Sequence, residues 1–165
     1  MNIKRIATHM LATDRQVNRA FPRSALTAIE NAINAAEAAH DGEIRFAVEG
    51  GLNGAPLFKD QSARERAIDV FSQLRIWDTE HNNGVLIYLL LADRQVEIVA
   101  DRGIHAKCGT GVWAVICREM ETAFKTANYE TGVVGGIEAV ARQLMNHFPP
   151  QAQARNELPD QPVVL

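Results

Sequence analysis

Polar residues that can bind a cation or a phosphate group flank two apolar segments in the middle of the chain. Asn82 and Asn83 precede the first segment, and Asp101 and Arg102 follow the second. Carboxylate and amide oxygens are the ligands that Ca²⁺ and Mg²⁺ prefer, and a guanidinium binds phosphate oxygens through paired hydrogen bonds. The residue types therefore indicate divalent-cation binding or phosphoester chemistry.

The two apolar segments predict a β-hairpin that brings these polar residues together. Residues 85–91 are all apolar, residues 92–94 form a tight Ala-Asp-Arg turn, and residues 96–99 alternate as an amphipathic strand does. The outer ends of an antiparallel pair lie at the same edge of a sheet. The continuous apolar character of residues 85–91 indicates a strand that is covered on both faces.

The preceding segments predict a third strand whose start lies at the same edge. A helical pattern near 26–36 ends at His40-Asp41-Gly42, residues 43–49 alternate as a strand, and residues 62–74 form another helix. A strand–helix–strand crossover is parallel and right-handed, so Glu43 begins its strand beside Gly84. With two later helices, near 111–125 and 131–147, we expect a three-layer α/β/α sandwich around a small mixed sheet, with an N-terminal accessory helix.

We expect a ligand site at this edge of the sheet. The best catalytic candidates are Asp101 and Arg102, and the expected metal ligands are Glu43, Asn83 and Asp101. The full set of expected ligand-binding residues is Glu43, Glu80, Asn82, Asn83, Asp101 and Arg102. The alternative is that Asn-Asn-Gly and Asp-Arg-Gly are ordinary turn sequences whose charged residues pair with each other.

Composition limits the classes of partner. The net charge of −3 gives no electrostatic footprint for nucleic acid. The longest apolar run, residues 85–92, is far shorter than the ~20 residues needed to span a bilayer. The first residues contain no continuous apolar segment of a secretory signal, and Cys108 and Cys117 lack metal-ligand spacing. We therefore expect a cytoplasmic protein with an unidentified protein partner.

The chain divides into three expected parts. Residues 1–22 form a basic amphipathic helix, residues 23–148 form the α/β/α domain, and residues 149–165 form a proline-rich tail that we expect to be disordered. The basic helix has two interpretations: contact with a membrane surface or a partner, or packing on the domain with a solvated basic face. Its thin apolar stripe favours the second.

Short motifs between about residues 26 and 148 resemble the TPM domain family. They are Asn83-Gly84-Val85-Leu86, the Ala92-Asp93-Arg94 turn, the strand 96–99, and Asn128-Tyr129-Glu130-Thr131-Gly132 before the last helix. The resemblance implies a three-layer α/β/α sandwich. Members of the family typically carry a signal peptide and often a membrane anchor, which we do not expect here, and some members are described as phosphatases or calcium binders. Here Ala100-Asp101-Arg102-Gly103 replaces the family's glycine-aromatic-glycine turn, which indicates a cytosolic branch with an altered site rim.

We therefore expect a TPM-like accessory or binding module that binds Ca²⁺ or Mg²⁺ around Asn83 and Asp101. The alternative is a weak metal-assisted phosphoester hydrolase at the same edge. The sequence contains neither a Cys/Arg phosphatase loop nor an Asp-rich metal pair, and this favours the module.

Overall fold

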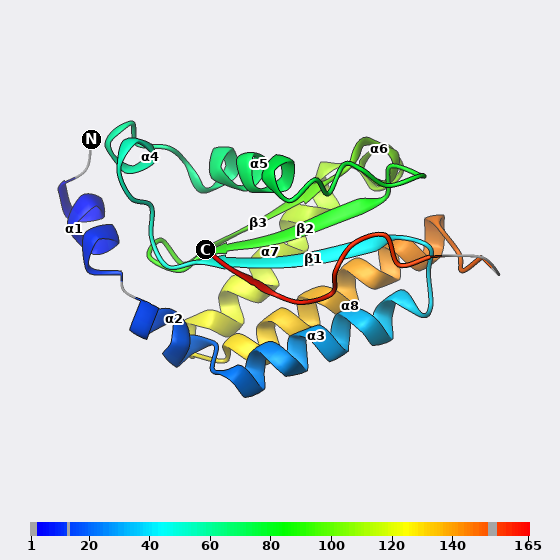
Figure 1. Ribbon diagram of the computed structural model, residues 1–165, viewed down its shortest axis with the longest axis horizontal. Coiled ribbons are helices and arrows are strands. Elements are labelled where there is room, and N and C mark those ends of the chain that lie inside the picture. Colours follow the sequence, from blue (N-terminus) through cyan, green and yellow to red (C-terminus); the bar gives the residue numbers. More distant parts are fainter. Residues whose placement is uncertain (1–2, 13, 152–154) are drawn as a thin grey trace.

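A four-stranded mixed sheet forms the centre of the computed structural model, which describes residues 3–12, 14–151 and 155–165. The strand order is β3-β2-β1-β4 (Figure 1). As the crossover rule predicts, β1 and β2 are parallel, and β3 returns antiparallel to β2. The strands are β1 (Glu43–Glu49), β2 (Gly84–Leu90), β3 (Gln95–Ala100) and β4 (Val163–Val164).

Helices cover both faces of this sheet (Figure 1). The α3, α7 and α8 helices pack on one face, and α4 and α5 pack on the other. The expected three-layer α/β/α sandwich is confirmed. The helices of the described residues are α1 (Ile3–Leu11), α2 (Asp14–Ala20), α3 (Arg23–Glu37), α4 (Ala55–Phe58), α5 (Ala63–Gln73), α6 (Arg102–Cys108), α7 (Thr110–Lys125) and α8 (Tyr129–His147).

Alternation along β2 supplies side chains to two separate cores. Val85, Ile87 and Leu89 belong to the core beneath α3, α7 and α8, whereas Leu86 and Tyr88 belong to the core beneath α5. Every residue of β2 is buried, as expected for a strand covered on both faces.

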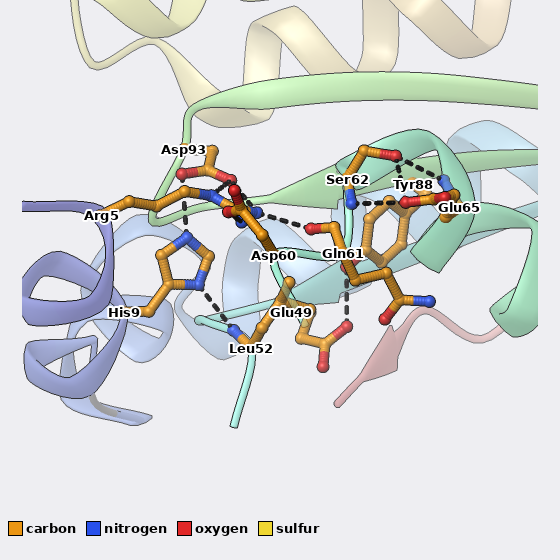
Figure 2. Close-up of polar contacts among 10 residues, drawn as sticks. All are labelled: Arg5, His9, Glu49, Leu52, Asp60, Gln61, Ser62, Glu65, Tyr88 and Asp93. Atoms are coloured by element: carbon orange, nitrogen blue, oxygen red, sulfur yellow. Dashed lines mark hydrogen bonds and ion pairs between the residues drawn. The ribbon is translucent and has the colours of Figure 1, made fainter. Parts of the chain in front are cut away.

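The α5 layer is fixed to the sheet through a buried carboxylate on β1. Glu49 accepts hydrogen bonds from the Arg66 guanidinium at 2.8 and 3.1 Å and from the Tyr88 hydroxyl at 2.7 Å. Burial, reinforced by the Glu49 carboxylate, raises the pKa of Tyr88, so the phenol remains a donor. The α5 helix itself begins at a capping box between Ser62 and Glu65 (Figure 2).

The C-terminal segment lies against the sheet. We expected residues 149–165 to be disordered, and this is wrong for residues 155–165, where Val163 and Val164 pair with Ala47 and Val48 of β1. The Leu165 N–H also donates to the Val48 carbonyl at 2.9 Å. The edge of β1 offers main-chain hydrogen bonds to this segment, and the amino-acid composition of the segment does not reveal such pairing. Residues 152–154 lie outside the described residues.

The N-terminal segment contains two helices, α1 and α2, where we expected one helix over residues 1–22; residues 1, 2 and 13 lie outside the described residues. Polar contacts hold α1 on the domain (Figure 2). The Arg5 guanidinium donates to the Asp93 carboxylate at 2.9 Å, and His9 Nε2 lies 2.8 Å from the other Asp93 oxygen. His9 Nδ1 accepts the Leu52 N–H at 2.9 Å, so the ring is neutral and its Nε2–H donates to Asp93.

Within the described residues, no helix has the length and apolar character needed to cross a bilayer.

Burial of Trp113 on α7 generates a stability prediction. Trp113 is 5% exposed, whereas Trp77 is 49% exposed. Trp113→Ala should lower the free energy of unfolding by about 3–5 kcal/mol, because it removes a large buried side chain and leaves a cavity. Trp77→Ala is the matched control and should cost less than about 1 kcal/mol. Urea denaturation measures both, and equal losses would show that the wrong face of α7 has been assigned to the core.

The attachment of α1 should depend on pH through Asp93. Burial alone would raise the pKa of Asp93, but hydrogen bonds from Arg5 and His9 outweigh it and the pKa is lowered. A carboxyl whose pKa is lowered in the folded state stabilises the fold at every pH above its pKa in the unfolded chain, which is about 4. This stabilisation is lost as the pH falls through the folded-state pKa.

Asp93→Asn should therefore destabilise the fold at pH 7 by roughly 1–3 kcal/mol. The difference from wild type should shrink as urea denaturation is repeated from pH 7 down to pH 3. The control is Asp60→Asn, because Asp60 also pairs with Arg5 but is half exposed, and it should cost less. A difference for Asp93→Asn that is constant with pH would contradict the assignment.

Candidate functional site

The expected sheet edge forms where β1 and β2 begin and β3 ends. Glu43 pairs in register with Gly84, and Val85 pairs with Ala100. The Asp101 N–H donates to the Gly84 carbonyl at 2.8 Å. The backbones of the predicted site residues therefore converge at one edge, as the hairpin and the crossover require.

Asn83 is buried at this edge and holds two loops together. Its N–H donates to the Thr79 hydroxyl at 3.2 Å, and its Nδ2 donates to the Asp41 carbonyl at 2.6 Å. Because a carbonyl can bond only to the NH₂ group, this contact fixes the orientation of the amide. The Asn83 Oδ1 atom is buried and makes no hydrogen bond with any described residue.

Asp101 ends the hairpin and begins α6, a short helix that we did not expect from the sequence. Asp101 Oδ1 accepts the Arg102 N–H at 2.6 Å in an N-capping contact. Its second oxygen, Oδ2, is buried and has no hydrogen-bond partner among the described residues. Arg102 lies across the preceding loop, where its Nε donates to Asn82 Oδ1 at 3.2 Å.

Gly103 allows α6 to approach the loop that carries Asn82. A Cβ atom at Gly103 would lie 2.5 Å from the Asn82 carbonyl oxygen and 2.7 Å from that of His81. Real Cβ atoms do not approach a main-chain oxygen so closely. The glycine is therefore a packing requirement that brings Asp101 and Asn82 to the same rim.

Glu43 lies at the same edge, but its side chain is used elsewhere. Its Oε1 and Oε2 accept the N–H groups of Glu157 at 2.9 Å and Leu158 at 3.1 Å. Burial raises the pKa of Glu43, although these two N–H groups lower it in part. Glu43 therefore anchors the C-terminal segment, with both oxygens already bonded.

A neighbouring carboxyl, Glu37 at the end of α3, is half-buried. It accepts the Ile44 N–H at 2.8 Å. Burial raises the pKa of Glu37 to about 9, and the nearby charges of Glu43 and Asp160 add to the effect. At neutral pH Glu37 is therefore protonated and is a poor cation ligand.

The outer loop contributes a rim of polar contacts. The Glu80 N–H donates to the Glu157 carboxylate at 3.1 Å, whereas the Glu80 side chain is exposed. His81 Nδ1 lies 2.9 Å from Asp41 Oδ2, which also accepts from Gln151 Nε2 at 3.2 Å. We did not expect Asp41 at this edge. The sequence feature that could have indicated it is its position directly before Gly42, where the helix pattern ends and β1 is about to begin.

The predicted residues thus separate into two sets. In the first set, Asn83 and Asp101 each leave one buried oxygen without a hydrogen bond at the shared edge. In the second set, Glu43 bonds to the C-terminal segment and the Glu80 side chain is exposed to solvent. No group of three or more His, Cys, Asp or Glu side chains is arranged to hold a metal ion in the described part of the chain. The arrangement offers two side-chain oxygens and a nearby guanidinium; that these residues bind a ligand stays a prediction.

A model of the TPM domain matches residues 17–143. The chain belongs to the TPM domain family. This match confirms the resemblance carried by the strand and turn motifs. The TPM match begins within α2 and ends within α8, so α1 and the C-terminal segment lie outside it.

Solved structures share the TPM fold of this chain. The NMR structure of the BA42 protein from the psychrophilic bacterium Bizionia argentinensis is 32% identical, with a TM-score of 0.74 over 86% of this chain and 93% of that chain. The N-terminal domain of a P. gingivalis protein, also solved by NMR, is 20% identical, with a TM-score of 0.58 over 73% and 76% of the two chains. The second likeness concerns the fold alone. No curated protein matches the sequence significantly.

The contacts of Glu43 predict that it holds the C-terminal segment in place. Glu43→Ala should speed hydrogen exchange at the amides of Glu157 and Leu158 by about tenfold or more, because each amide loses its hydrogen-bond acceptor. NMR exchange measures these amides individually. Glu138→Ala, which removes an exposed carboxylate from α8, is the control and should leave both amides unchanged. Unchanged exchange in Glu43→Ala would remove Glu43 from this role.

Proposed function

We propose that this TPM domain is an accessory module that binds a divalent cation, Ca²⁺ or Mg²⁺, at the edge formed by Asn83 and Asp101. The observation that carries the proposal is the pair of buried oxygens, Asn83 Oδ1 and Asp101 Oδ2, that have no hydrogen-bond partner among the described residues. Both belong to the edge where three strand ends meet.

A buried oxygen without a partner is costly, by about 1–3 kcal/mol and more for a charged group. A hard cation offsets this cost, because it takes carboxylate and amide oxygens as ligands. The fixed orientation of the Asn83 amide supports the proposal, since the Asp41 contact leaves the oxygen and not the NH₂ group unbonded. We leave Glu43 out of the proposed ligand set, because both of its oxygens already accept N–H groups from the C-terminal segment.

The proposed site should bind weakly. Asp101 is its single carboxylate, and the positive charge of Arg102 lies next to it in the chain. Main-chain oxygens and water must complete the coordination of the ion. We therefore expect a dissociation constant in the range of about 10⁻⁴–10⁻³ M, as in sites with few charged ligands.

Asp101→Asn tests the site with the fold preserved, because Asn caps a helix as well as Asp does. In the wild type, millimolar Ca²⁺ or Mg²⁺ should raise the melting temperature relative to EDTA, as binding to the folded state alone requires. Calorimetry should show at least about tenfold weaker binding in Asp101→Asn, which loses the charged ligand. Glu138→Gln removes the same charge from α8 and should bind as the wild type does. If neither ion binds the wild type at millimolar concentration, the edge is purely structural.

The alternative proposal, a weak metal-assisted phosphoester hydrolase, is supported by the position of Arg102. Its Nε donates to Asn82. The other N–H groups of its guanidinium bond to no described residue, and they suit phosphate oxygens. A p-nitrophenyl phosphate assay separates the two functions. Turnover that is lost in Asp101→Ala would favour the hydrolase, and cation binding without turnover would favour the module.

We further propose that the module acts through a protein partner. The support is that the rim residues occupy loops around the edge, where a bound ion would change the surface charge seen by another protein. A cytoplasmic location stays a prediction from the sequence.

A further inference from the structure

We infer that a second site, at the opposite end of the sheet, binds a small organic anion that carries a carboxylate or phosphate group on an apolar body. A hollow of about 570 Å³ lies there between the N-terminal helices, the β2–β3 turn and the start of α8. Its volume is typical of small-molecule sites. The residues that matter for recognition are Thr8, Gln16, Arg19, Leu91, Arg94 and Tyr129.

The hollow lies well away from the proposed cation site. The cation edge adjoins Gly84 at the start of β2, whereas Leu91 follows the end of this strand. Seven residues of extended chain span roughly 20 Å. A ligand in the hollow therefore does not share residues with Asn83 or Asp101.

Two arginines from separate elements line the hollow without counter-charges. Arg19 belongs to α2 and Arg94 to the β2–β3 turn. Neither makes an ion pair or a side-chain hydrogen bond with any other residue that the structure describes. Asp93 precedes Arg94, but its carboxylate is bound by Arg5 and His9 and does not neutralise Arg94. The hollow therefore carries two unpaired guanidinium groups, which bind carboxylate and phosphate oxygens in pairs.

The turn that presents Arg94 is fixed before any ligand arrives. The Arg94 N–H donates to the Leu91 carbonyl at 3.1 Å, and the Ala92 N–H donates to the Gly50 carbonyl at 3.0 Å. The α1 helix also holds the turn through Asp93 (Figure 2). Pre-ordered binding groups lose less conformational entropy when a ligand binds.

The opposite walls are also anchored, and they are apolar. The ring of Tyr129 stacks on Phe124, with 5.2 Å between centroids, and packs against Phe21 at 5.6 Å. Leu91 is partly buried beside the hollow. An apolar or aromatic ligand body would lie against these side chains while its anionic group meets the arginines.

Part of the lining of the hollow comes from residues that the family model does not cover. Thr8 and Gln16 precede the matched residues 17–143, as do Arg5 and His9, which hold the turn. Gln16 offers an amide that can bond to a polar group of the ligand. The Thr8 hydroxyl donates to the Lys4 carbonyl at 2.9 Å, and its oxygen can still accept a hydrogen bond. Specificity for the ligand would therefore come from residues outside the family's common domain.

The test uses the full chain in EDTA, so that the proposed cation site plays no part. Phenyl phosphate, benzoate, inorganic phosphate and benzyl alcohol are titrated while NMR follows the amides of Ala92, Ala127 and Tyr129. Phenyl phosphate or benzoate should shift these amides and saturate at millimolar concentration. Inorganic phosphate lacks the apolar body and benzyl alcohol lacks the charge, so both should bind at least about tenfold more weakly. The tighter of the two aromatic anions identifies the group that the site prefers.

Arg19→Gln and Arg94→Gln should each weaken binding of the preferred probe by about tenfold or more, because each removes a charged donor. Arg15→Gln is the matched control, since Arg15 is an exposed arginine on α2 that does not line the hollow. All three positions are exposed, and the amide spectrum verifies the fold of each variant. The proposal is overturned if no aromatic anion shifts these amides at about 20 mM, a concentration well above the millimolar dissociation constant that we expect. It is also overturned if Arg15→Gln weakens binding as much as the other two variants do.

Discussion

The burial of β2 on both faces is the constraint that organises this molecule. All seven of its residues are buried, so a helical layer must cover each side. The one polar side-chain group on the strand, the Tyr88 hydroxyl, is bonded to Glu49. Polar chemistry is displaced to the two ends of the strand. One end carries the Asn83 and Asp101 oxygens, and the other carries the turn with Asp93 and Arg94. The two proposed sites therefore follow from one packing requirement.

The neighbouring strand, β1, carries two carboxylates, Glu43 and Glu49, into this apolar setting, and each accepts hydrogen bonds from a distant segment. Glu49 is bonded by Arg66 and Tyr88, and Glu43 is bonded by the amides of the C-terminal segment. An alternative docking of α5 or of the C-terminal segment would leave one of these carboxylates buried without a partner, at a cost of several kcal/mol. The buried charges of β1 thus select one arrangement of the surrounding elements.

Local periodicity predicted three strands of the sheet but not β4, and the meeting of Asn83 with Asp101 at one edge followed from topology alone. The direction of the Glu43 side chain did not, because its partners lie 114 and 115 residues away. For the same reason His9 gave no signal, since Asp93 is 84 residues distant. The α6 helix was missed because it is short and includes Gly103, a poor helix former; the glycine serves the packing against Asn82 and not the helix.

The pairing of β4 with β1 also has a consequence for the order of folding. The β1–β2–β3 core uses contacts within about sixty residues of chain, whereas the strand that protects the outer edge of β1 arrives from more than a hundred residues away. Closing so long a loop is slow relative to local pairing. Until β4 docks, the edge of β1 is unprotected and can pair with another chain. High protein concentration during refolding should consequently favour strand exchange between molecules over the closure of each molecule on itself.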